Sequence, residues 1–270
     1  MKKFFLIFIF FFSGNLLISA NYYFLDFYPD VSPVNKFASE LVSYINSVDN
    51  SSKFINIRDK NIFKSSSQIL DALQSNVIQI AVIPAYTINN SLQNPLKDIN
   101  YKSSNTIIEK LMIPYREKLR DYGLFLLDIF YFGRYSFFTT VKPSNSKLLI
   151  GTLFPIKFEN KNIEKSLIID ETANVKGLIK SGILNALIIT PIQFYNFKLT
   201  DSKIKYKTSI KNLYSYLIVV ANETFWDSID FNVKSVIWSY ITNYHSTFQS
   251  NYSKLNVFIK NLLTKKLIFY

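Results

Sequence analysis

The chain has no cysteine among its 270 residues and only one histidine, His245. The lack of thiols excludes disulfides, thiolate metal sites and thiol redox chemistry. A single histidine excludes zinc sites and metal centres built from several histidines, and His245 lies in a polar part of an expected helix, where a surface role is the default. None of the six glycines forms a GxGxxG or GxxxxGK pattern, so no phosphate-binding loop is indicated.

Paired carboxylates are the remaining candidates for catalysis. Each pair falls at an expected strand end or helix cap, where a carboxylate has an ordinary structural role. The sequence therefore predicts that the protein is not an enzyme and uses no metal or cofactor. The pairs are Asp170 with Glu171, Asp26 with Asp30, and Asp227 with Asp230.

The N-terminus has the pattern of an export signal. Lys2 and Lys3 precede an unbroken apolar run over residues 4–12, which is well short of the roughly 20 residues that a membrane-spanning helix needs. Small residues at 19 and 20 predict cleavage after Ala20 and a periplasmic location, with an uncleaved anchor as the alternative. No cysteine follows the run, which excludes a lipid-modified N-terminus.

The composition is that of a globular protein with a substantial core. Hydrophobic residues make up 49% of the chain and aromatic residues 17%, which excludes a disordered or fibrous chain. The net charge of +12 comes mostly from lysines, since only four residues are arginine. These lysines are scattered, and an exported chain with dispersed charge is not expected to bind nucleic acid.

Strands and helices alternate in the first part of the chain. Strands are predicted over 22–27, 54–57 and 78–83, with helices that begin at Ser32 and Ser67 between them. Strands joined by crossover helices pair in parallel, so the fold class is α/β. Later elements are a helix over 105–122, strands over 124–131, 135–141, 147–153, 184–189 and 213–220, a short helix over 174–181, and a long helical region from Asp230 or Asn232.

The apolar pattern of residues 68–85 recurs without a gap at 174–191. This is either a repeated lobe or a chance recurrence of a common helix, turn and strand unit. Two such lobes would face each other across a cleft, where open α/β sheets bind their ligands. The predicted division is a signal peptide over 1–20, lobe 1 over 21–141 with a return of 203–222, lobe 2 mainly over 142–222, and a bridging helical region over 223–270.

Several short segments, in order, carry a resemblance to a known family. Together they resemble the DctP-like solute-binding proteins of tripartite ATP-independent periplasmic (TRAP) transporters, with this chain as a divergent member. The segments are FASEL at 37–41, ILDALQ at 69–74, IAVIP at 80–84, YGL at 122–124, FGR at 132–134, LIKSGILN at 178–185, YKT at 206–208, VVAN at 219–222 and FWDSI at 225–229.

The resemblance implies a two-lobed solute-binding fold with an interlobe cleft and a long C-terminal helix. It further implies capture of a small organic acid, whose carboxylate an arginine usually clamps, and delivery of that acid to membrane permease subunits. This chain departs from the pattern, because its segment 147–152 contains no arginine. Loss of the clamp favours an alternative function, an exported interaction or sensor module that no longer binds small molecules.

Six residues are the predicted ligand contacts. Arg134 is the one arginine near a predicted cleft strand and is the expected partner of the ligand carboxylate, with a surface or interlobe salt bridge as its alternative role. Five polar residues at strand ends complete the set: Tyr86, Tyr135, Thr190, Gln193 and Asn222. The alternative is core packing for the two tyrosines and helix capping for Thr190 and Asn222.

Overall fold

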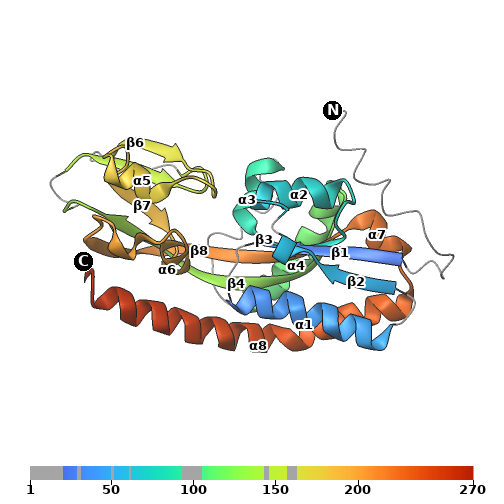
Figure 1. The fold of residues 1–270 in the computed structure, drawn as a ribbon. Coiled ribbons are helices and arrows are strands. Elements are labelled where there is room, and N and C mark those ends of the chain that lie inside the picture. The colour runs from blue at the N-terminus through green and yellow to red at the C-terminus, as the bar shows by residue number, and fades with distance from the viewer. Residues whose placement is uncertain are drawn as a thin grey trace.

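The computed structural model describes residues 21–28, 32–49, 52–60, 62–92, 105–142, 146–156 and 163–269. The expected signal peptide lies outside these residues. Within them, nine strands form one mixed sheet in the order β2-β1-β3-β8-β4-β7-β5-β6, with β9 paired to β8. Figure 1 shows an elongated molecule whose two lobes are joined by long strands and one long helix.

The first lobe is an α/β unit built on three parallel strands. β1 pairs in parallel with both β2 and β3, as predicted from the alternation of strands and helices. Successive side chains of β3 enter different cores: Ile80 and Val82 join the cluster around α1, whereas Ala81 and Ile83 join the cluster around α2. The elements are β1 (Asn21–Phe27), α1 (Ser32–Val48), β2 (Ser52–Asn56), η1 (Arg58–Lys60), α2 (Ser66–Gln74), β3 (Ile80–Pro84), α3 (Ala85–Ser91), α4 (Asn105–Arg120) and α7 (Glu223–Ser228).

The second lobe repeats this plan with fewer helices among its described residues. β5 pairs in parallel with both β6 and β7. α5 begins after Asn174, whose side chain accepts a hydrogen bond from the backbone N–H of Gly177. The elements are β5 (Leu148–Thr152), β6 (Ile163–Ile168), α5 (Val175–Lys180), β7 (Ala186–Ile189), α6 (Pro191–Asn196), η4 (Leu199–Asp201) and β9 (Ile268–Phe269).

The repeated apolar pattern corresponds to equivalent elements in the two lobes. α2, β3 and α3 follow one another in lobe 1 as α5, β7 and α6 do in lobe 2. The turn residues that align in the repeat, Asn76 and Gly182, both have positive φ, at 57° and 79°. One detail of the prediction is wrong: α2 is capped by Ser65 and not by Ser67, since the Ser65 side chain accepts the N–H of Gln68.

Two long antiparallel strands, β4 (Leu124–Thr139) and β8 (Tyr206–Asn222), run through both lobes. In lobe 1 β8 pairs with β3, and in lobe 2 β4 pairs with β7. The two separate strands predicted over 124–131 and 135–141 are thus one strand. Register shifts on both sides of Gly133, whose φ is +107°, let the strand bend while its pairing with β8 continues.

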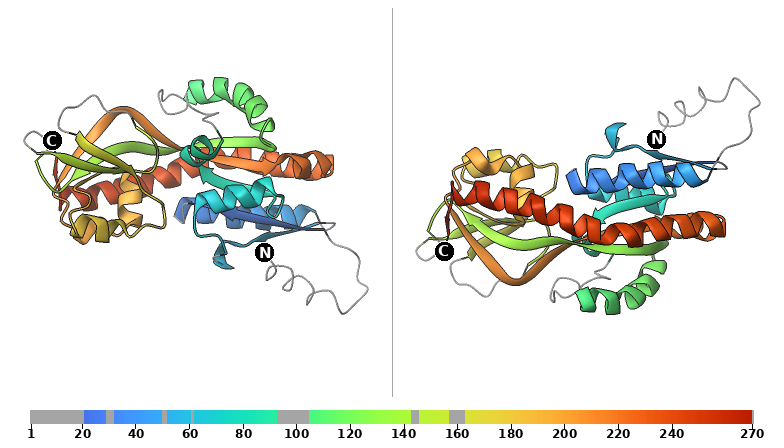
Figure 2. Two further views of the ribbon diagram at one scale, coloured as in Figure 1. Left: turned by 90° about the horizontal axis from the view of Figure 1, so that it is seen from above. Right: turned by 90° about the horizontal axis from the view of Figure 1, so that it is seen from below.

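A single helix, α8 (Phe231–Thr264), lies along both lobes, as the long C-terminal helix was predicted to do (Figures 1 and 2). Asp230 is its N-cap and accepts the N–H of Asn232. Midway, Phe248 stacks on Phe130 of β4 with ring centroids 4.2 Å apart. Just beyond its end, Lys266 pairs with Asp201 of lobe 2 at 3.0 Å. Neither α8 nor any other helix in the described ranges is long and apolar enough to cross a membrane.

Candidate functional site

A pocket of about 310 Å³ lies between the two lobes. Lobe 1 contributes the start of α2 and three residues of α3, and lobe 2 contributes Leu153 after β5 and the end of β6 with the residues that follow it. Its volume falls at the lower end of the roughly 300–1,000 Å³ typical of small-molecule sites. The lining residues are Ser66, Ser67, Tyr86, Thr87, Asn90, Leu153, Ile168, Ile169, Asp170 and Glu171.

Glu171 of lobe 2 crosses this pocket and binds lobe 1. Its Oε2 accepts the backbone N–H of Ser66 at 2.8 Å, and the Ser66 hydroxyl lies 2.8 Å from both carboxylate oxygens. The hydroxyl of Tyr86 donates to Oε1. The hydroxyls of Ser66 and Thr87 are 2.6 Å apart and form a further hydrogen bond. A carboxylate is therefore held at the start of α2 by donors from a single lobe.

Burial and hydrogen bonding act in opposite directions on Glu171. Desolvation by burial raises its pKa above the ordinary value, and the neighbouring charge of Asp170 raises it further. The hydrogen bonds from Tyr86 and Ser66 oppose this rise, because they stabilise the charged form. Burial and the charge of Glu171 likewise raise the pKa of the Tyr86 hydroxyl, which therefore stays a neutral donor.

Two further contacts close the pocket. The Asn90 side-chain amide donates to the Leu153 carbonyl at 3.1 Å, a further hydrogen bond between the lobes. The Phe154 ring lies between two tyrosines, stacked at 6.2 Å from Tyr86 and tilted at 4.9 Å from Tyr135. Two of the predicted ligand contacts are therefore brought together: Tyr86 lines the pocket, and Tyr135 packs behind it against Phe154.

The structure does not bring Arg134 to this pocket. Tyr135 is buried against Phe154, whereas the neighbouring Arg134 is exposed and lies against Tyr214. The exposed Arg134 guanidinium lies 3.3 Å from the Tyr214 hydroxyl and 5.3 Å from the centre of its ring. Among the described residues that line the pocket there is no lysine or arginine. Whether Arg134 contacts a solute stays a prediction, and this arrangement lends it no support.

Three other predicted contacts are engaged as helix caps away from the pocket lining. Thr190 and Gln193 form a reciprocal capping box at the start of α6, with bonds of 2.8 and 3.2 Å. Asn222 caps α7 by accepting the N–H of Phe225, and its amide donates to the Leu73 carbonyl at 2.9 Å. The structural alternative foreseen for Thr190 and Asn222 is thus present, while a ligand role for all three stays a prediction.

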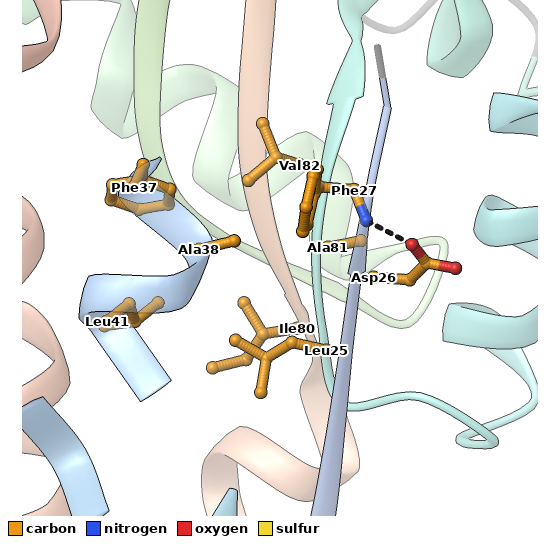
Figure 3. A pocket seen from close by; sticks show the side chains of 9 residues that line it. All are labelled: Leu25, Asp26, Phe27, Phe37, Ala38, Leu41, Ile80, Ala81 and Val82. Atoms are coloured by element: carbon orange, nitrogen blue, oxygen red, sulfur yellow. Dashed lines mark hydrogen bonds between the residues drawn. The ribbon is translucent and has the colours of Figure 1, made fainter. Parts of the chain in front are cut away.

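A second, much smaller depression lies between α1 and strands β1 and β3 (Figure 3). Its volume of about 10 Å³ is close to the space that one water molecule requires. Apolar side chains surround it, and the Asp26 carboxylate accepts the N–H of Phe27 at 2.7 Å. This depression is too small for an organic solute, so the interlobe pocket is the candidate site.

Sequence reasoning missed Ser66, Thr87, Asn90 and Glu171 as pocket residues. Glu171 was noticed in its pair with Asp170, which was assigned to a strand end or helix cap, but nothing in the sequence shows that this segment faces the other lobe. No cluster of His, Cys, Asp and Glu that could hold a metal ion occurs within the described ranges. The site offers hydroxyl, amide and carboxylate groups, which suit recognition of a polar solute.

Comparisons with known proteins find no matching family model and no matching curated protein. Solved structures of similar fold are TRAP periplasmic solute-binding proteins. One from Ochrobactrum anthropi, with its C-terminus bound in the ligand pocket, has a TM-score of 0.74 at 15% identity and covers 94% of this chain and 84% of its own.

Two others hold small acids. A protein from Sulfitobacter with bound β-D-galacturonate has a TM-score of 0.75 at 12% identity, over 92% of this chain and 88% of its own. A protein from Pseudomonas aeruginosa with bound L-malate also has a TM-score of 0.75 at 12% identity, over 92% and 93%. The chain therefore has the two-lobed α/β fold of the TRAP periplasmic solute-binding proteins, which confirms the fold expected from the resemblance.

Proposed function

We propose that this protein is the solute-binding receptor of a TRAP-type transporter. It captures a small organic acid between its lobes in the periplasm and delivers it to the membrane permease subunits. The observation that carries the proposal is the interlobe pocket of about 310 Å³, with hydroxyl donors from lobe 1, in a fold shared with receptors that hold malate or galacturonate. Binding in an interlobe pocket is coupled to hinge closure, and closure is what such a permease would recognise.

Lobe 1 supplies the groups for acid recognition in this proposal. Ser66 offers both a backbone N–H and a hydroxyl, and Tyr86 and Thr87 add two more buried hydroxyls. Hydrogen bonds from such donors to a carboxylate are charge-assisted and stronger than neutral ones. Asn90 lies on the same helix as Tyr86 and adds an amide. These donors replace the arginine clamp that the sequence lacks in segment 147–152.

A thermal-shift screen of residues 21–270 tests the proposal. The panel contains L-malate, D-galacturonate and other mono- and dicarboxylates, with neutral sugars and amines of similar size as comparators. An acid at 100 times its dissociation constant stabilises the folded protein by about 2.7 kcal/mol, which raises Tm by about 5 to 10 °C for a chain of this size. No shift with any carboxylate, together with a shift for an amine or sugar, would overturn the ligand class.

The alternative function is an exported interaction module that has lost small-molecule binding. One observation favours it: the pocket lining among the described residues has two carboxylates and no cationic side chain. In that case the whole panel, comparators included, leaves Tm unchanged, and native mass spectrometry shows no small molecule carried through purification. A single carboxylate hit that survives dilution and rebinding excludes the alternative.

A further inference from the structure

The interlobe pocket is already bridged by a carboxylate of the chain itself. Glu171 follows β6 in lobe 2, yet its contacts reach Ser66 and Tyr86, which are 105 and 85 positions away in lobe 1. All of these contacts come from hydrogen-bond donors. They are also the donors that the proposed function assigns to a solute's carboxylate, so the Glu171 side chain occupies the position at which such a group would bind.

Glu171 is not arranged to accept hydrogen bonds from a solute. A carboxylate has about four lone-pair positions. Oε1 is contacted by the hydroxyls of Ser66 and Tyr86, and Oε2 by the N–H and the hydroxyl of Ser66. The single Ser66 hydroxyl proton is shared between the two oxygens, and the Thr87 hydroxyl can donate to the Ser66 oxygen in turn. A hydrogen-bond donor on a solute would therefore compete with Ser66 and Tyr86 for the lone pairs of Glu171. The carboxylate of an acid, in contrast, could replace the Glu171 carboxylate as the acceptor for Ser66 and Tyr86.

The adjacent Asp170 behaves differently and provides an internal comparison. Its Oδ1 accepts the N–H and the hydroxyl of Thr172, both within the same turn of lobe 2. Asp170 also lines the pocket but is exposed. Two neighbouring carboxylates therefore lie at one pocket, but Asp170 accepts hydrogen bonds from Thr172 of its own lobe, whereas Glu171 accepts them from the other lobe.

We propose that Glu171 is a tethered carboxylate that closes the lobes of the ligand-free protein, and that an acidic solute competes with it for Ser66 and Tyr86. The competition rests on the proposed function, but the closing contact does not. A receptor that is available to solute for only a fraction of the time binds with an apparent affinity reduced by that fraction. If the Glu171 bridge is formed about 90% of the time, acids bind about tenfold more weakly than they would without it.

The closing contact is tested without any solute. The chain has no native cysteine, so spin labels can be attached at Asp71→Cys on α2 and Lys176→Cys on α5, both exposed. Pulsed electron resonance then reports the distance between the lobes. Glu171→Ala is expected to lengthen this distance. Tyr86→Phe is also expected to lengthen it, because it removes the lobe 1 hydroxyl that binds Glu171. Glu164→Gln, at an exposed carboxylate of β6 that does not line the pocket, leaves the distance unchanged.

An unchanged distance in folded Glu171→Ala protein overturns the proposal, as does an equal lengthening in Glu164→Gln. The competition is tested by titrating L-malate and D-galacturonate into the unlabelled proteins. Glu171→Ala is expected to bind an acid about tenfold more tightly than the wild type, and weaker binding overturns the competition. If the lobes open in Glu171→Ala but neither protein binds any acid, the competition and the proposed ligand class both fail, while the closing contact stands.

Discussion

The two lobes carry the same helix, strand and helix unit but present it to the pocket in different ways. In lobe 2, Thr190 is the N-cap of α6 and forms a reciprocal capping box with Gln193. The equivalent helix of lobe 1, α3, has Pro84 at its N-cap position with no side-chain capping bond, and its first turn places Tyr86 and Thr87 in the pocket. The capped helix start of lobe 2 lies away from the pocket lining, so the proposed function assigns acid recognition to lobe 1.

Lobe 2 contributes to the pocket from a different place. Its pocket residues precede α5, in the segment that contains Asp170 and Glu171, and follow β5 at Leu153. The pocket is therefore asymmetric, with donors on one side and an acceptor on the other. The two sides of the pocket thus have complementary chemistry, and this complementarity allows one lobe to bind the other before any solute arrives.

The largest expected effects concern α8, which packs against both lobes. Leu263→Ala near the lobe 2 end and Ile241→Ala beside lobe 1 each remove a side chain with no more than 2% exposure. Each substitution is expected to lower the free energy of unfolding by about 2–5 kcal/mol, measured by urea denaturation. Val257→Ala, at a position of α8 that is 57% exposed, is the control and should change little. A large loss at one end only would show that α8 stabilises a single lobe.

The bend in β4 between the lobes should be nearly as sensitive. Gly133 has φ +107°, and an added Cβ would collide with the Tyr252 hydroxyl, which donates to the Phe132 carbonyl at 2.8 Å. Gly133→Ala is expected to cost about 2–4 kcal/mol of unfolding free energy, from backbone strain and the collision together.

Gly123→Ala is the matched control for this bend. Gly123 also has positive φ, at +70°, but there is open space around its missing Cβ. It should lose only about 1 kcal/mol, the cost of the left-handed backbone alone. Equal losses for the two glycines would show that the close approach of Tyr252 does not shape the bend.

The self-capped helix start in lobe 2 gives a smaller effect. Thr190→Ala removes the hydroxyl that accepts the N–H of Gln193, and the buried donor loses its partner. Unfolding free energy should fall by about 1–2 kcal/mol, whereas Thr190→Ser keeps the hydroxyl and most of the stability. If Thr190→Ala also weakened acid binding while the fold stayed intact, lobe 2 would take part in recognition. That result would contradict the assignment of acid recognition to lobe 1 alone.

The smallest expected effect is a dependence of lobe closure on pH. Burial raises the pKa of Glu171 in the closed protein above the ordinary value expected once the lobes separate. Closure therefore takes up protons, so it is favoured as pH falls and weakened as pH rises through the raised pKa. The titratable groups that act on the pKa of Glu171 are Tyr86 and Asp170, and the charge of Glu171 in turn raises the pKa of the Tyr135 hydroxyl.

The interlobe distance between spin labels, followed from pH 4 to pH 8, measures this dependence. The interlobe distance should lengthen with rising pH in the wild type. In Glu171→Ala it should not lengthen as the pH rises. Lengthening as pH falls would contradict the assigned direction.

Much of the fold could be predicted from the sequence, because its elements have strong local signals. The period-2 and period-3.6 apolar patterns located the parallel strands of lobe 1 and the helices around them. Gly123 and Gly182 stop helices as expected, and both have positive φ. The continuity of β4 was missed because residues 132–134 read locally as a break, whereas pairing with β8 across both lobes keeps the strand intact.

The candidate site was harder to predict than the fold. Local patterns identify strand ends, and Tyr86 was found in this way, but they do not show which strand ends face each other. Arg134 was chosen because arginine suits a carboxylate, yet the face of β4 on which it lies depends on the register of the sheet. Glu171 was noticed and assigned a local role, since its partners are about 85 and 105 residues away in the chain.

The most direct test of the account is the distance between lobes in Glu171→Ala as L-malate or D-galacturonate is added. The account predicts that this variant is open without solute, because the bridge to Ser66 and Tyr86 is gone, and that it closes in a saturable way on one of these acids or on another carboxylate. A variant that stays open at every concentration of every carboxylate would contradict the claim that the two lobes close on an organic acid.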